Sequence, residues 1–465
     1  MISTPHGQKD IPRALLMAIL IYTLIFIAYT FINHYTFGTQ AYDTGIYIQS
    51  LWTTANDEGF FYNTPEAQGL GWELPSKSHF GVHFQPILLL LVPLYKVFPH
   101  AELLFFVHTL ALALAAIPLY KLAYAVLDDK KMSLIVAVGY LINPAIHGIN
   151  RYDFHPVSLV VPFIFLTMLY WERKDYKKAF LVAGFVLLAK EDAGLVLISI
   201  GLFYILLNLK WANLTKPHKL VQTYIKEINL ILLGALWIVL SIFIVIPYFG
   251  GHGYSFGFYT LKVHYPQLAK QLIFIHLASV VFLPVLCPQL FLATLPLWAE
   301  LVLSPAYGML KIGYHYPYML TPMLFLISIY SLRTYKIPWR YVASIMIMSF
   351  LLFSPLVNLS KSPDVAGVSF SALIKRAETN WELYKALHEE LKEYSSFDGK
   401  LVVQDNVFPH LANNPNVYLL REHNIDDAQL ILVCPAFRDL YTRYYIPLIL
   451  NMSNVINICP GFIDS

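Results

Sequence analysis

Residues 14–32 have the sequence ALLMAILIYTLIFIAYTFI, which contains no charged side chain. An α-helix rises about 1.5 Å per residue, so a run of this length crosses the roughly 30 Å hydrocarbon core of a bilayer. The run is too long for the apolar part of a signal peptide, and no small-residue cleavage site follows it. We therefore interpret it as a first transmembrane helix that is kept in the mature protein.

Outward from this helix, the whole chain has the composition of a membrane protein. Of its 465 residues, 57% are hydrophobic and only 13% are charged, whereas soluble proteins carry about 25% charged residues. Further apolar blocks occur at residues 103–120, 132–147, 156–171, 179–189, 193–209, 227–248, 270–286, 288–303, 317–332 and 339–358. These blocks predict an all-α polytopic membrane protein, with about eleven transmembrane helices in a domain formed by residues 1–358.

One apolar segment breaks this pattern. Residues 84–99 (FQPILLLLVPLYKVFP) contain three prolines and are too short to span a bilayer. We expect them to lie in the membrane interface or to re-enter the membrane. They would close a long first loop, residues 33–100.

The distribution of lysine and arginine predicts the orientation of the chain. With the N-terminus inside, the inner segments hold 16 of these residues and the outer loops hold 7. Cytoplasmic loops carry the excess of positive charge in membrane proteins. The expected topology is a multi-pass protein of the plasma membrane with a cytoplasmic N-terminus, and an odd number of spans then leaves the C-terminal tail outside.

The tail, residues 359–465, is predicted to be a small α/β domain. Residues 371–394 have helical periodicity, and short strand-like runs follow at 401–403, 417–420 and 430–433. Two of the three cysteines, Cys434 and Cys459, lie in this tail. They could pair if the tail lies outside, but free buried thiols are the interpretation that we favour.

Polar residues gather in three places that this topology puts on one side of the membrane. Ionisable groups at membrane depth are costly and therefore usually face a cavity and serve a function. The first loop contains Asp43, His79 and His83; the second outer loop contains Arg151, Asp153 and His155; the third corner contains Lys190, Glu191 and Asp192. We expect these three clusters to converge on one extracytoplasmic site.

Each cluster also has a structural interpretation. Asp43 precedes an amphipathic stretch, so it is either an N-cap or a catalytic carboxylate. His79 and His83 are four residues apart, and either pack at the interface or, with Asp43, hold a divalent cation such as Mg²⁺ or Mn²⁺. The Lys190–Asp192 run is either a tight external turn or, as we favour, a polar corner of a site.

Five stretches of this sequence resemble a known family. They are YDTGIYIQSLW (42–52), SHFGVHFQPILLLLVPLY (78–95), YDFHP (152–156), AKEDAGLVL (189–197) and VQDNVFPHLANNPNVYLL (403–420). Together, and in this order, they resemble the membrane proteins grouped as domain of unknown function 2079 (DUF2079). That family is in turn similar to the GT-C superfamily of membrane glycosyltransferases, so the resemblance implies a GT-C-like fold.

The resemblance also implies an activity. Members of that superfamily transfer sugars from polyprenyl-phosphate donors at the external face, and they carry acidic residues in the first two external loops. Asp43 and Asp153 would be the catalytic residues here. Asp43 stands alone rather than in an acidic pair, which weakens the case for a metal.

The leading hypothesis is therefore a glycosyltransferase that acts on an extracytoplasmic glycan, lipid or protein acceptor. Positive groups would stabilise the departing lipid phosphate, and other polar side chains would shape the sugar pocket. We assign Arg151, Lys190 and His315 to the first group, and Glu191, Asp192, His155, Tyr42 and Gln49 to the second. No basic stripe indicates a nucleic-acid partner. A lipid or small-molecule transporter or flippase is the alternative, because buried ionisable residues and interrupted spans also suit that class.

Overall fold

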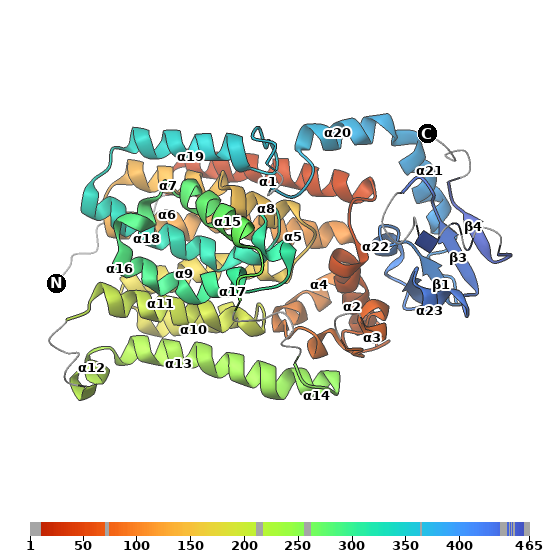
Figure 1. Ribbon diagram of the computed structural model, residues 1–465, viewed down its shortest axis with the longest axis horizontal. Helices are drawn as coiled ribbons and strands as arrows, with labels where there is room; N and C mark the ends of the chain where they lie inside the picture. Colours follow the sequence, from red (N-terminus) through yellow and green to blue (C-terminus); the bar gives the residue numbers. More distant parts are fainter. Residues whose placement is uncertain are drawn as a thin grey trace.

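The computed structural model describes residues 11–69, 74–210, 217–254, 262–362, 365–437, 444, 445, 447, 449 and 452–459. Most of the described chain forms a bundle of helices, and a small parallel sheet lies at one end of this bundle (Figure 1). The predicted combination of a mostly helical chain and a small α/β segment near its C-terminus is therefore confirmed.

The bundle is built from the first nineteen α-helices. In chain order these are α1 (Arg13–Tyr35), α2 (Ile46–Ala55), α3 (Thr64–Gln68), α4 (Val92–Val97), α5 (Ala101–Leu114), α6 (Ala116–Leu127), α7 (Lys130–Leu141), α8 (Pro144–Arg151), α9 (Val161–Glu172), α10 (Tyr176–Leu187), α11 (Gly194–Leu207), α12 (Pro217–Thr223), α13 (Ile225–Leu240), α14 (Ile246–Gly250), α15 (Pro266–Ser279), α16 (Pro288–Phe291), α17 (Leu295–Val302), α18 (Leu320–Tyr335) and α19 (Trp339–Phe353).

Within the described residues, three helical stretches are long and apolar enough to cross a membrane unaided. They are Arg13–Tyr35, Ala101–Leu127 and Ile225–Gly250. A fourth arises if α7 and α8, which meet at a bend of 40°, count as one span. The expected number of about eleven spans is therefore not confirmed, although the first predicted helix is.

Proline explains part of this difference. The ring of Pro144 prevents α7 from continuing, because it disfavours helical geometry at the preceding residue, Asn143. Asn143 instead adopts an extended conformation and caps α8 by accepting a hydrogen bond from the Ala145 amide. Apolar runs that were expected to be single spans are thus divided into helices of one to three turns.

The segment at residues 84–99 also contains no helix long enough to span. It forms a 3₁₀ turn, η3 (Pro86–Leu90), followed by the short helix α4. Several of its apolar side chains, among them Leu90, Leu94 and Val97, are exposed on the surface of the protein. This exposure agrees with a segment that borders lipid.

The tail adds four α-helices and a four-stranded parallel sheet with the strand order β2-β1-β3-β4 (Figure 1). Its elements are α20 (Phe370–Thr379), α21 (Trp381–Lys392), β1 (Leu401–Val403), α22 (Phe408–Leu411), β2 (Val417–Leu419), α23 (Glu422–Ile425), β3 (Leu430–Val433) and β4 (Val455–Asn457). The three predicted strands are confirmed, β4 was not predicted, and the single helix expected at 371–394 is two helices that meet at Asn380.

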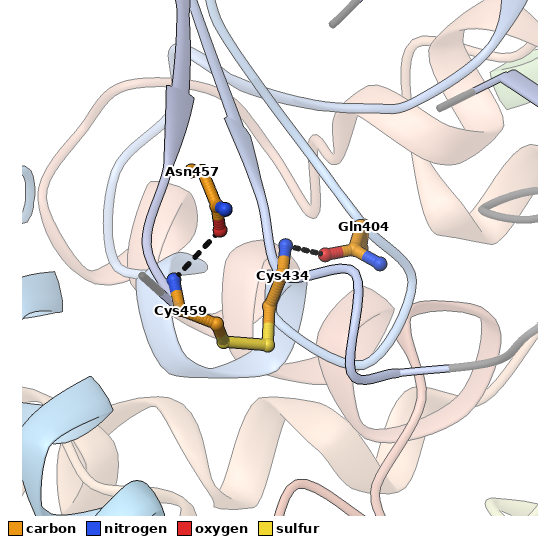
Figure 2. Close-up of a disulfide and its surroundings, with 4 residues drawn as sticks. All are labelled: Gln404, Cys434, Asn457 and Cys459. Carbon is orange, nitrogen blue, oxygen red and sulfur yellow. Dashed lines mark hydrogen bonds between the residues drawn. A yellow bond between two sulfur atoms is a disulfide. The ribbon is translucent and has the colours of Figure 1, made fainter. Parts of the chain in front are cut away.

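Cys434 and Cys459 form a disulfide, so our preference for free thiols was wrong (Figure 2). Cys434 directly follows β3, Cys459 lies two residues after the end of β4, and these two strands are neighbours in the sheet. Their Cα atoms are consequently 5.0 Å apart, within the range that a disulfide bridges. The sequence concealed this pairing because it gave no signal for β4.

The tail and the first loop share one hydrophobic core. Phe37, Leu51 and Phe80 of the loop belong to the same buried cluster as Leu387 and Leu401 of the tail. A larger, separate cluster fills the bundle. The sheet is therefore built onto the first loop, at the end of the bundle where α2, α3 and α4 also lie (Figure 1).

Candidate functional site

A cavity of about 370 Å³ lies where the three polar clusters meet. Its walls come from the first loop, the second outer loop, the corner after α10, Tyr254 beyond α14, and α17 with the segment that joins it to α18. The predicted site residues that line it are Tyr42, Asp43, His79, His83, His155, Lys190, Asp192 and His315. Side chains from all three clusters therefore line one cavity.

Asp43 lies in a single π-helical turn, η1 (Ala41–Gly45), between α1 and α2. The residue before α2 is Gly45, and no side chain caps that helix, so the N-cap interpretation of Asp43 is wrong. The Asp43 carboxylate instead contacts the second outer loop. Tyr152 donates its hydroxyl hydrogen to Oδ2 at 2.7 Å, and Nε2 of His155 lies 3.1 Å from Oδ1.

His155 is held between two oxygen atoms. Its Nε2 faces the Asp43 carboxylate, and its Nδ1 lies 3.3 Å from the carbonyl oxygen of Asp153. These two contacts fix the orientation of the His155 ring beside Asp43. The ring also stacks on His315, with centroids 3.6 Å apart.

His315 faces the cavity in its neutral form. Burial, followed by the nearby His155 and Lys190, lowers the pKa of His315 well below the usual value. Its Nδ1 is buried and has no hydrogen-bond partner among the described residues. A ring nitrogen of this kind is available to a bound ligand, but it brings no positive charge.

Asp153 does not line the cavity. Its Oδ2 accepts a hydrogen bond from the Gln40 amide at 2.9 Å, immediately before the turn that carries Asp43. Burial and the neighbouring charge of Asp43 raise the pKa of Asp153 to about 8. The Asp153 carboxyl is turned toward the backbone and holds the turn in place, and this position does not support the predicted catalytic role.

Arg151 and Gln49 also lie outside the cavity. The Arg151 guanidinium donates to the carbonyl oxygen of Ala366 at 3.1 Å. Gln49 is fully buried and donates to the carbonyl oxygen of Asn414, while its own oxygen accepts from the Thr64 amide. Both residues join the membrane domain to the tail, so their predicted roles at the phosphate and in the sugar pocket are not supported.

The corner after α10 is a polar wall of the cavity and not an exposed turn. Glu191 is 1% exposed and Asp192 is 9% exposed. Nδ1 of His83 lies 2.9 Å from Glu191 Oε1, and Nζ of Lys190 lies 3.2 Å from Asp192 Oδ2. Burial alone would raise the pKa of Glu191, but His83 and Lys190 lower it to about 2.

The two loop histidines bind different carboxylates. Nδ1 of His79 lies 2.8 Å from Glu66 Oε1, and its Nε2 lies 2.8 Å from Gln85 Oε1. Burial lowers the pKa of His79, but Glu66 more than offsets this and raises it above the usual value. His83 is bound to Glu191 instead, so the two rings do not converge on one point.

These residues do not fit the divalent cation that the histidine spacing suggested. Across the ranges that the structure covers, no group of three or more His, Cys, Asp or Glu side chains is arranged to hold a metal ion. A metal site needs several such ligands around one point.

Sequence reasoning missed two acidic residues in the cavity wall, Glu66 and Glu300. Glu300 lies on α17 beside Asp192, which also accepts a hydrogen bond from the Tyr318 hydroxyl at 2.8 Å. A usable signal existed, because Glu300 is the only acidic residue between positions 228 and 363. A lone carboxylate in an apolar run indicates a functional cavity. Glu66 had no such signal, since its surroundings are polar.

Comparison with solved structures finds a partial likeness. The crystal structure of the Archaeoglobus fulgidus oligosaccharyltransferase in the apo form aligns with a TM-score of 0.43 and 12% identity. The alignment covers 87% of this chain and 64% of that chain. At this TM-score the likeness supports no statement about activity.

Comparison by sequence gives a firmer result. No curated protein matches the chain. A family described as "Predicted membrane protein (DUF2079)" matches residues 33–443, which include the turn that carries Asp43, the corner at Lys190 and most of the tail. The chain therefore belongs to the DUF2079 family of membrane proteins.

Proposed function

We propose that this protein is a glycosyltransferase that moves a sugar from a polyprenyl-phosphate donor to an extracytoplasmic acceptor. The observation that carries the proposal is the position of Asp43. Its carboxylate lines a polar cavity beyond the first membrane helix, and Tyr152 and His155 hold it there. A carboxylate fixed by donors at the wall of a cavity is suited to act as a general base.

The reaction requires one proton transfer and one substitution. The acceptor hydroxyl gives its proton to Asp43, and its oxygen attacks the anomeric carbon of the sugar. The bond between that carbon and the phosphate oxygen breaks, and its electron pair leaves with the lipid phosphate. Two donors to Asp43 hold the carboxylate in one orientation, which reduces the entropic cost of reaching the transition state.

The same cavity holds groups that would stabilise the departing phosphate. Lys190 supplies a positive charge, although Asp192 and Glu191 offset part of it. His83 is 31% exposed and adjoins the same corner. The neutral His315 ring offers a hydrogen-bonding nitrogen without charge. Donors that point to the place where negative charge develops lower the barrier of such reactions.

The dimensions of the cavity favour a small head group. Sites for small ligands enclose roughly 300–1,000 Å³, and the volume here is at the lower end of that range. A single sugar with its phosphate is therefore the favoured donor head. The exposed apolar side chains of η3 and α4 directly follow Gln85, which lines the cavity, and we assign the polyprenyl chain to that side.

The disulfide of the tail supports an extracytoplasmic location for the site. Disulfides persist in oxidising compartments and are rare in the cytosol. Cys434 and Cys459 join the ends of two strands whose sheet packs against the first loop. If the tail lies outside, the cavity lies on the same side, in agreement with the excess of lysine and arginine in the opposite loops.

An assay with purified protein in liposomes tests the proposal. Radiolabelled polyprenyl-phosphate sugars are added with a panel of glycan, lipid and peptide acceptors, and both free lipid phosphate and labelled acceptor are measured. Release of lipid phosphate that requires Asp43 supports the glycosyltransferase. Exchange of intact donor across the bilayer without its cleavage would instead show a flippase and overturn the proposal.

A further inference from the structure

The carboxyl edge of the tail sheet faces the turn that carries Asp43. In a parallel sheet with the order β2-β1-β3-β4, the chain leaves the two central strands, β1 and β3, in opposite directions. Open α/β sheets bind their ligands in the crevice that this reversal creates at the carboxyl ends of the strands. Here Gln404 and Asp405 directly follow β1, and Asp405 contacts η1 of the membrane domain.

Two hydrogen bonds join the tail to the start of the turn that carries Asp43. Oδ1 of Asp405 accepts a hydrogen bond from the Ala41 amide at 3.1 Å. Arg421, two residues after the end of β2, donates from a terminal guanidinium nitrogen to the Tyr42 hydroxyl at 2.7 Å. The tail therefore contacts the two residues that immediately precede Asp43.

An apolar contact fixes the other end of the turn. A β-carbon built on Gly45 would lie 2.7 Å from the ring of Phe408, so the tail packs directly against the backbone at this point. Phe408 is fully buried and opens α22, which packs on η1. The turn is thus held at its start by hydrogen bonds and at its end by packing.

We infer that Asp405 and Arg421 are positioning residues for Asp43, and that the tail sheet uses its carboxyl edge to hold the π-helical turn in its working shape. π-Helical turns are rare and occur frequently at functional sites. They need support from their surroundings, because the α-helix is the more stable alternative. The expected effect of these contacts on the rate of sugar transfer rests on the proposed function, whereas their expected effect on the conformation of the turn does not.

The hydrogen bond from the Ala41 amide to Asp405 can be tested by removing its acceptor oxygen and then restoring it. Asp405→Ala removes the oxygen that binds the Ala41 amide, and Asp405→Asn keeps an oxygen in its place. Asp427→Ala is a matched control, since Asp427 belongs to the same domain, is 68% exposed and pairs with Lys400, at the opposite edge of the sheet. Hydrogen–deuterium exchange of residues 40–46 in the full-length protein reports on the turn directly.

We expect amide exchange in this segment to speed up about 10-fold in Asp405→Ala, to return toward the native rate in Asp405→Asn, and to stay unchanged in Asp427→Ala. In the transfer assay, kcat should fall about 10- to 100-fold with little change in the KM for the donor, because a displaced base affects the transition state. Native exchange rates in Asp405→Ala would overturn the inference.

A second variant keeps the test valid if Asp405→Ala does not fold. Ala41→Pro deletes the same hydrogen bond from the loop side, and Gln40 already has the extended conformation (φ −124°, ψ 157°) that a following proline requires. Exchange at residues 42–45 should then speed up, and adding Asp405→Ala should cause no further change. If the native protein cleaves no donor, the proposed function fails while the exchange data still decide the role of Asp405.

Discussion

The imidazole of His83 and the carboxylate of Glu191 lie 2.9 Å apart, although 108 positions separate them in the chain. This contact joins the first loop to the corner after α10 on a single side of the bundle. The two segments therefore meet directly in the folded protein. The proposed active site depends on that arrangement.

Substitution of Asp43 tests the general base. Asp43→Asn preserves the shape of the side chain and its contact with Tyr152, but it cannot take a proton. We expect kcat/KM for sugar transfer to fall by about 10²- to 10⁴-fold, with native expression and thermal stability. Asp57→Asn, an exposed position of the same loop, is the control. Equal activity in both variants removes Asp43 from the mechanism.

Substitution of Asp153 separates a positioning carboxyl from a catalytic one. Its pKa is about 8 in the folded protein and near 4 in an unfolded chain. Between these values the unfolded state binds fewer protons, so stability falls as pH rises from about 4 to 8. Asp153→Asn keeps an acceptor for the Gln40 amide and cannot ionise.

We therefore expect the melting temperature of the Asp153→Asn variant to fall less than that of the native protein between pH 5 and pH 8. Differential scanning fluorimetry in detergent measures the melting temperatures of the variant and of the native protein. The variant should also retain more sugar transfer than Asp43→Asn. A parallel pH dependence in the two proteins contradicts the role of Asp153.

Replacement of Lys190 tests the phosphate site. Lys190→Gln leaves the buried carboxylates of Glu191 and Asp192 without their nearest ammonium group, so we expect a lower melting temperature as well as weaker donor binding. Loss of one charged hydrogen bond corresponds to about a 10-fold rise in the KM for the donor. Lys190→Arg should restore most of the melting temperature and most of the donor binding. Lys96→Gln, at an exposed position, should change neither the melting temperature nor the KM for the donor.

Removal of the disulfide should loosen the tail. Cys434 and Cys459 are 25 positions apart, and a bridge that closes a loop of this size contributes about 2–4 kcal/mol to stability. The double variant Cys434→Ser/Cys459→Ser should exchange the β3 and β4 amides faster than the native protein. Cys287→Ser, at the free and half-buried cysteine, should not. Mobility on gels with and without reductant reports whether the bond forms in the cell.

Enlargement of Gly45 tests the packing between the tail and the turn. Gly45 has helical backbone angles (φ −62°, ψ −45°), so alanine causes no backbone strain there. Its β-carbon would nevertheless collide with the Phe408 ring. We expect Gly45→Ala to destabilise the protein by about 1–3 kcal/mol. Adding Phe408→Leu should relieve part of this loss, and an equal loss in both variants contradicts the contact.

The sequence identified the residues of the cavity better than their roles. Unpaired charges in apolar surroundings are costly, so Asp43, Lys190 and Asp192 stood out and do line the cavity. Arg151 and Asp153 stood out for the same reason, yet they bind backbone groups. Composition and spacing show that such a side chain needs a partner, but only the fold shows whether that partner is a cavity or a backbone amide.

The number of spans was the weakest prediction. Hydropathy measures how apolar a segment is, and it does not register where a helix stops. Pro144 divides one apolar run into two helices that meet at a bend. Three of the four tail strands, β1, β2 and β3, were in contrast predicted correctly, because short apolar runs between Asn and Pro clusters carry a local signal. The pairing of β3 with β4, and with it the disulfide, depends on distant contacts that no local pattern reveals.

The hydrogen bond between Ala41 and Asp405 spans 364 positions of the chain. During synthesis the ribosome makes the turn near the beginning and its partner near the end. Until the tail has been translated and folded, the turn that carries Asp43 therefore lacks the support that we infer for it. Under the proposed function, a partly made or truncated chain would transfer no sugar.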